Sequence, residues 1–164
     1  MTVKIVKNIL PQIIEAMNAL AKKEVLVGIP SDSDKNARDD APITNAQIGY
    51  INEFGAPEMN IPPRPSLIPG VKSAWPDASR YMAKGAKSVL SGAVSPIATV
   101  EKALNGAGLI AQAAVVQEIN DGLEPVLAAA TLAARKRNGF EGENPMIVTG
   151  SYKASITYVV KNND

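Results

Sequence analysis

Few side chains in this sequence are equipped for catalysis, because it contains no cysteine and no histidine. Disulfides, zinc sites with Cys or His ligands, and catalysis by either residue are therefore excluded. What remains is Glu53, a lone carboxylate beside Phe54 and Gly55, and Arg64 in the stretch PPRPS. One hypothesis is a small enzyme that uses Glu53 with Arg64. A general base needs a positioned partner, however, and no second acid or activated nucleophile stands nearby in the sequence.

Structural roles explain the same two residues better. Glu53 is expected to form a salt bridge with Arg64 or a hydrogen bond with loop backbone. Arg64 lies among prolines that favour polyproline geometry, which holds its guanidinium group on a stiff stem. Two interpretations of Arg64 stay open: a contact with a neighbouring chain, or a clamp on Glu53 within one chain. The sequence therefore predicts no enzyme, no catalytic residue and no cofactor.

The most metal-like pattern is DSDKN, which places Asp32, Asp34 and Asn36 at the first, third and fifth positions of a calcium-binding loop. The pattern then fails. Its sixth position is Ala37, where the turn needs glycine, and its twelfth is Ile43, where calcium needs a bidentate glutamate. This stretch is better interpreted as a solvated polar loop, so no metal site is predicted.

A third hypothesis, a nucleic-acid-binding module, rests on the basic cluster Arg135, Lys136 and Arg137. Phosphate binding needs a basic surface, whereas the whole chain has a formal net charge of +1. Aromatic residues, on which bases stack, make up 4% of the chain and none interrupts the cluster. Three cations at the C-terminal end of a helix are better explained by the helix dipole.

The elements that must position these residues alternate between helices and short strands. Periodicity, capping residues and prolines predict helices at 11–23, 43–54, 71–90, 97–120 and 126–139, with a turn or short helical piece at 149–154. Strands are expected at 2–6, 24–29 and 155–160. The predicted fold class is α+β, with a small antiparallel sheet packed by several α-helices and an extended proline-rich loop.

Some local signals are specific. Thr44 with Gln47 three residues later predicts a capping box, and Gly55 predicts the end of the same helix. Three apolar residues fall near one face of that helix: Ile48, Ile51 and Phe54. The near-continuous apolar run at 24–29 predicts a strand buried on both faces. In the helix at 97–120, a stripe of small and apolar residues is expected to face a neighbouring helix: Val100, Leu104, Ala107, Ala111 and Ala114.

Bulk properties place the chain among ordinary globular proteins. Its 164 residues predict a single domain spanning 1–164, and 46% of them are hydrophobic. No stretch approaches 18 uninterrupted apolar residues, so no membrane span is expected. The start MTVKIVKNILPQ does not have the character of a signal peptide. The expected compartment is the cytoplasm, or a particle assembled there.

Four segments resemble one known family in their order along the chain. They are VLVGIP (25–30), AQIGYINEFGAPEMNIPPRPSL (46–67), TLAARKR (131–137) and VTGSYKASITYVV (148–160). This order resembles the bacteriophage neck and tail-completion proteins, the lambda Z-like group of minor tail components. In that family a strand ends in VGI, a helix ends in N-E-F-G, and I-P-x-R-P-F, T-L-x-x-R-K and D-T-G-x-L-x-x-S-I-x-Y follow. Three positions depart from the pattern: Ser66 replaces the aromatic residue, Val148 the acidic residue and Tyr152 the leucine.

The resemblance implies a structural virion protein of a tailed phage, assembled in the host cytoplasm. Such proteins form a homo-oligomeric ring at the head–tail junction, or at the top of the tail, and bridge the connector to the tail-tube proteins. The alternative within the family is a tail terminator that caps tail polymerisation. Genome DNA is expected to pass through the ring without sequence-specific binding. No enzymatic activity, cofactor or membrane partner comes with the resemblance.

Ring interfaces are heterologous, so one patch of each subunit meets a different patch of the next. Extended proline-rich loops suit such contacts by insertion, and a C-terminal strand suits them by strand addition. Two loops are the candidates, Gly55–Leu67 and Pro30–Pro42. The residues expected at the assembly interface are Glu53, Phe54, Ile61, Pro62, Pro63, Arg64, Pro65 and Leu67.

Overall fold

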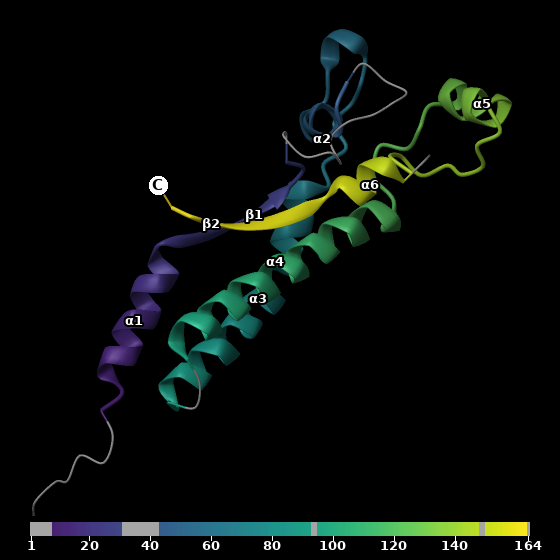
Figure 1. Ribbon diagram of the computed structural model, residues 1–164. Helices are drawn as coiled ribbons and strands as arrows, with labels where there is room; N and C mark the ends of the chain where they lie inside the picture. The colour runs from purple at the N-terminus through teal and green to yellow at the C-terminus, as the bar shows by residue number, and fades with distance from the viewer. Residues whose placement is uncertain (1–7, 31–42, 93–94, 148–149, 164) are drawn as a thin grey trace, which may run out of the picture. The chain divides into compact units, whose positions relative to one another are not determined.

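The computed structural model describes residues 8–30, 43–92, 95–147 and 150–163. In chain order its elements are α1 (Leu10–Ala21), β1 (Lys23–Gly28), α2 (Asn45–Phe54), the 3-10 helix η2 (Pro57–Met59), α3 (Leu67–Leu90), α4 (Pro96–Asp121), α5 (Ala129–Arg137), α6 (Ser151–Ser155) and β2 (Thr157–Asn162) (Figure 1). Strands β1 and β2 pair in a two-stranded antiparallel sheet. The predicted α+β fold class is confirmed.

The chain divides into two compact units, each made of stretches distant in sequence. Unit 1 holds Met1–Leu26, Trp75–Ile110 and Val159–Asp164, and unit 2 holds Val27–Ala74 and Ala111–Tyr158. Helices α3 and α4 and both strands contribute residues to each unit. The expectation of a single domain stays a prediction. Among the described helices, none is long and apolar enough to cross a bilayer.

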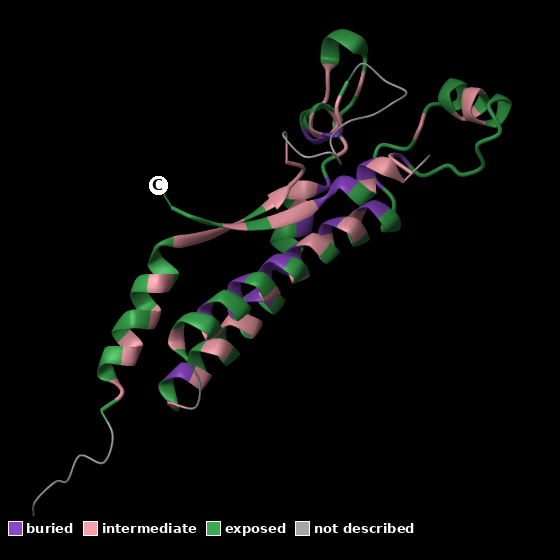
Figure 2. Ribbon diagram, in the orientation of Figure 1, coloured by how far each residue is buried: buried purple, intermediate pink, exposed green. Residues whose placement is uncertain are grey.

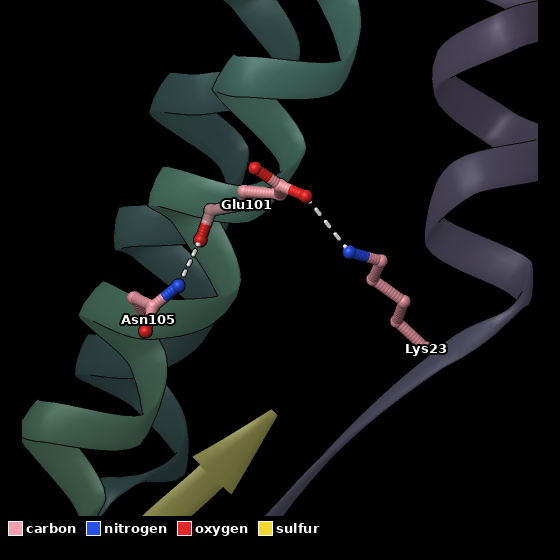
Figure 3. Close-up of polar contacts among 3 residues, drawn as sticks. All are labelled: Lys23, Glu101 and Asn105. Atoms are coloured by element: carbon pink, nitrogen blue, oxygen red, sulfur yellow. Dashed lines mark hydrogen bonds and ion pairs between the residues drawn. The ribbon is translucent and has the colours of Figure 1, made fainter. Parts of the chain in front are cut away.

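Unit 1 contains α1, the C-terminal part of α3 and the N-terminal part of α4. Its buried residues are small or aliphatic: Ala78, Val89, Val100, Ala103, Leu104 and Ala107. Lys23 Nζ forms an ion pair with Glu101 Oε1 at 2.9 Å, and Asn105 Nδ2 donates to the Glu101 carbonyl at 2.8 Å (Figure 3). Within unit 1, the β1 strand is thereby tied to α4 by its first residue.

Unit 2 contains a more continuous core. Its buried cluster comes from α4, the residues after it, and the C-terminal segment: Val115, Ile119, Leu123, Tyr152 and Ile156. Val27, Ile29, Ile48 and Leu67 pack against this cluster and are half-buried. Figure 2 shows the buried residues in purple along α4 and α6. The cluster brings together the strand, helix and C-terminal segments on which the family resemblance rests.

The structure bears out some sequence expectations and corrects others. The capping box of α2 and the helices, including the short α6, lie where the pattern predicts them to within a few residues. Four of the five residues of the α4 stripe are buried, and the fifth, Ala114, is half-buried. The predicted strand at 2–6, the DSDKN stretch and most of the loop at 30–42 lie outside the described residues.

Burial of β1 on both faces was a wrong prediction. Every residue of β1 keeps partial exposure, and Leu26 is exposed. A continuous apolar run is typical of an inner strand in a wide, covered sheet. In the described part of the chain β1 has one partner, β2, so its side chains are hidden only in part.

Candidate functional site

The end of α2 sets the geometry of the candidate site. At the helix start, Thr44 Oγ1 accepts from the Gln47 N–H at 3.2 Å, and Gln47 Oε1 accepts from the Thr44 N–H at 2.8 Å. At the helix end, Gly55 adopts φ +78°, and a Cβ there would lie 2.9 Å from the Pro63 nitrogen. Glycine is therefore required where the chain turns out of the helix and passes close to the prolines.

The segment that follows, residues 56–66, is called here the proline arm. It begins as a closed loop, because Ala56 and Ile61 exchange two backbone hydrogen bonds of 2.9 and 3.0 Å. Its extended second half is held to α2 by the Arg64 N–H, which donates to the Asn52 carbonyl at 2.6 Å. Prolines restrict the rest of this segment to a narrow range of φ. The proline arm thus has little conformational freedom to lose on binding.

Glu53 projects from the last turn of α2 to the N-terminus of α3. Its Oε2 accepts from the N–H groups of Ser66 and Leu67 at 2.8 and 2.9 Å, and its Oε1 accepts from the Ile68 N–H at 2.9 Å. These are N–H groups that a helix start leaves without intrahelical partners. The carboxylate also carries a negative charge at the positive end of the helix dipole. Glu53, buried to 7% exposure, is therefore a helix cap supplied by another helix.

Arg64 is half-buried and binds a different part of unit 2. Its Nε donates to the carbonyl of Pro125, and its Nη2 donates to the carbonyl of Val126 at 3.1 Å. The planar fork of a guanidinium group suits two successive carbonyls in this way. Arg64 thus fastens the proline arm to the segment between α4 and α5.

The predicted salt bridge between Glu53 and Arg64 is wrong. Among the described residues no ion pair joins them, because Glu53 meets three backbone donors and Arg64 meets two backbone acceptors. The alternative that the sequence left open, a hydrogen bond of Glu53 with loop backbone, is confirmed. The clamp role of Arg64 is also found, but on Pro125 and Val126 instead of Glu53.

The other expected interface residues fall into two groups. Phe54, Pro62, Pro63 and Pro65 are exposed, whereas Ile61 and Leu67 are half-buried. Phe54, 57% exposed, packs against Tyr50, 66% exposed, with ring centroids 4.9 Å apart and ring planes tilted by 48°. Beside this pair lies a hollow of about 270 Å³ that is mostly apolar. Its lining residues are Ile29, Ala46, Gly49, Tyr50, Glu53, Phe54, Leu67 and Ile68.

The buried face of α2 consists of polar and small residues, two of which, Gly49 and Glu53, also line the hollow. The buried positions of α2 are Asn45, Gly49 and Glu53, not the apolar Ile48, Ile51 and Phe54. The three buried residues are spaced by four, which places them on one face of the helix. That spacing is the sequence feature from which the buried face could be identified. A Cβ on Gly49 would lie 3.5 Å from the Tyr152 ring, so the small residue makes room for Tyr152.

Two departures from the family pattern lie in this same region. Ser66 is fully buried directly before α3, and its N–H is one of the donors to Glu53. Tyr152 belongs to the buried core cluster of unit 2. Burial raises the pKa of the Tyr152 phenol above its usual 10.0, the Ser66 side chain lowers it, and the Glu53 carboxylate raises it. The net direction is upward, so the phenol stays neutral.

This raised pKa predicts a loss of stability at alkaline pH. Above about pH 10 the unfolded chain releases the Tyr152 proton while the folded chain still holds it, so rising pH favours unfolding. We expect the urea midpoint of the wild-type protein to fall more steeply between about pH 9 and pH 11 than that of Tyr152→Phe. Tyr50→Phe, on an exposed tyrosine, should follow the wild type. Equal slopes for wild type and Tyr152→Phe would contradict the buried phenol.

The basic cluster lies in the last turn of α5, as expected from the helix dipole. Arg135 is occupied within its own unit, because its Nη1 donates to the carbonyls of Gly142 and Asn144 at 3.4 and 2.9 Å. Lys136 and Arg137 are exposed. Arg135 therefore holds the loop at Gly142 and Asn144, and Lys136 and Arg137 are the two cations of the cluster that a phosphate group could reach.

Comparisons with known proteins do not assign the chain to a family. No family model, no curated protein and no solved structure matches it.

Proposed function

We propose that this chain is a structural virion protein of a tailed bacteriophage, which forms a ring at the head–tail junction and bridges the connector to the tail tube. The order of the four family-like segments motivates the proposal. The observation that carries it is the support of the proline arm. Glu53 and Arg64, the charged residues of the N-E-F-G and P-x-R-P segments, both bind backbone and hold the proline arm from two sides.

A rigid segment with exposed prolines suits a heterologous ring contact. Pro62, Pro63 and Pro65 are exposed on the proline arm, and Phe54 is exposed at its base. Because backbone hydrogen bonds already fix this segment, little entropy is lost when a neighbouring subunit binds it. Aromatic side chains such as Tyr50 and Phe54 are enriched among the residues that dominate binding energy. These surfaces are our candidates for one side of the subunit contact.

The same geometry supports a non-enzymatic role. A general base must reach a substrate proton with a free carboxylate oxygen. Both oxygens of Glu53 accept from backbone N–H groups at or directly before the start of α3, so proton transfer would compete with the cap. The hollow that Glu53 helps to line is mostly apolar, which fits an apolar side chain of a neighbour.

Arg64→Ala tests the proposal. Removal of the guanidinium group releases the proline arm from Pro125 and Val126, so we expect infectious particles to fall at least about tenfold, the effect of losing about 1.4 kcal/mol of binding. Circular dichroism of the purified variant should stay that of the wild type, because the unit 2 core is untouched. Virus titre and electron microscopy of necks measure the outcome.

Arg80→Ala is the matched control, since Arg80 is exposed on α3 and forms an ion pair with Asp77 one turn away in the same helix. It should leave titre and neck assembly unchanged. Normal infectious particles from Arg64→Ala, or a virion reconstruction that places the chain off the head–tail axis, would overturn the proposed function.

A further inference from the structure

Helix α1 lacks the burial that normally stabilises a short helix. It has 12 residues, and none of them is buried. Figure 2 shows α1 in pink and green along its length. Isolated helices of this length are marginal in water, and in proteins they form because an apolar face is covered. The contacts of α1 within unit 1 therefore account for only part of its stability.

The apolar face of α1 is wider than the surface that its own unit covers. Ile13, Ala16 and Leu20 lie on one side and, with α3 and α4, line an apolar hollow of about 400 Å³ in unit 1. On the adjoining side, at helical spacing, Leu10 is 58% and Ile14 is 49% exposed.

Met17 lies between the two sides. It lines the hollow and is still 65% exposed. The surface is thus continuous from the floor of the hollow to the open side of α1. We call the exposed part the α1 stripe, which consists of Leu10, Ile14, Met17 and Leu20 on α1 with Leu90 at the rim of the hollow on α3.

Polar contacts fix the C-terminal end of α1 within unit 1. The Asn163 N–H donates to the Lys22 carbonyl at 2.8 Å, and its side chain donates to the Ala21 carbonyl at 3.3 Å. The next residue, Lys23, pairs with Glu101 at 2.9 Å (Figure 3). The α1 stripe is therefore presented by a helix whose end is tied down, which makes it a defined surface.

We infer that the α1 stripe is a self-association surface and that its occupant is a second copy of this chain, which docks through its own α1 stripe. The five side chains are 41–65% exposed, so complete burial of the stripe in two copies removes on the order of 1,000 Å², about the lower bound for a specific interface. The stripe carries no charge, so identical copies meet without repulsion. An area at this bound indicates a dimer whose population depends on concentration.

Isologous pairing brings equivalent residues of the two copies together near the two-fold axis. Ile14 lies in the middle of the stripe, and the wild-type chain contains no cysteine. Ile14→Cys therefore places a single reporting thiol on each copy. We expect this variant to form a covalent dimer under mild oxidation, seen on a non-reducing gel. Glu15→Cys, an exposed position about 100° around the same helix from Ile14 and outside the stripe, should stay largely uncrosslinked.

Mass measurement by light scattering over a range of concentrations gives the second readout. The mass of the wild-type protein should rise with concentration, whereas the mass of Ile14→Asp should stay constant because its copies cannot pair through the stripe. The circular dichroism of Ile14→Asp should match the wild type, because Ile14 is not buried. Thr131→Asp, which adds the same charge at an exposed position of α5 outside the stripe, should behave as wild type.

Equal cross-linking of both cysteine variants, or a mass that Ile14→Asp does not alter, would overturn the inference. The occupant of the stripe would then be another part of the chain or a different protein. The inference does not depend on the proposed ring. Arg64→Ala should leave the Ile14→Cys cross-link intact, so the two hypotheses fail separately.

Discussion

Glu53→Ala should lower the free energy of unfolding by about 3–5 kcal/mol, because each buried N–H group left without an acceptor costs about 1–3 kcal/mol. Three N–H groups at the start of α3 lose their acceptor, and two of them belong to residues that are buried or half-buried. The proline arm joins α2 to α3, so it also loses one of the two side chains that hold it. Urea unfolding followed by circular dichroism measures the change.

Two further variants separate the cap from general effects of charge. Glu53→Gln keeps one acceptor oxygen but points an amide donor at N–H donors, so it should lose somewhat less than Glu53→Ala. Glu58→Ala removes an exposed carboxylate from η2 in the same segment and should change stability by less than about 0.5 kcal/mol. If Glu53→Gln and Glu58→Ala proved equally stable, the capping role of Glu53 would be refuted.

The start of α2 shows what a sequence can specify. Thr44 and Gln47 form the expected capping box, and Gly55 ends the helix, because these contacts lie within a few residues of one another. Short-range hydrogen bonds depend on spacing alone. The α+β class was predictable for a related reason, since alternation and helical periodicity are local properties.

The partners of Glu53 and Arg64 could not be found in this way. Arg64 binds carbonyls 61 and 62 positions away, which no local pattern indicates. Glu53 binds a helix start that was expected at residue 71 but lies at Leu67. The prolines of this stretch favour an extended chain and so argue against a helix start at Leu67. Pro69 is nevertheless tolerated, because it falls in the first turn, where a missing N–H costs little. The three N–H groups just before Pro69 are those that Glu53 accepts from.

A hydrophobic pattern does not reveal the buried face of α2, because that face is not apolar. Asn45, Gly49 and Glu53 point inward, while Phe54 is exposed. Gly49 on the inward face lies against Tyr152, where a large side chain would not fit. Glu53 on the same face caps α3, which requires a carboxylate and not an apolar side chain. Exposed aromatic residues beside a rigid proline arm are more informative about assembly than about the core.

Gly70→Ala should be the most damaging single methyl addition to unit 2. A Cβ on Gly70 would lie 2.6 Å from Val115 Cα and 2.9 Å from Val115 N, atoms of the α4 backbone. A backbone cannot rotate away as a side chain can, so α3 and α4 would have to separate over the buried core that contains Val115. We expect a loss of about 3 kcal/mol, at the upper end for overpacking.

Gly85→Ala provides the comparison, because it makes the same change in the same helix. Its Cβ would lie 3.2 Å from the Ala103 Cβ, a contact that a small shift relieves. Alanine also gains up to about 1 kcal/mol over glycine in a helix, so this variant should be close to wild type or slightly more stable. The difference between the two urea midpoints isolates the close approach of α3 to α4 at Val115. Equal midpoints would mean that the two backbones are not in contact there.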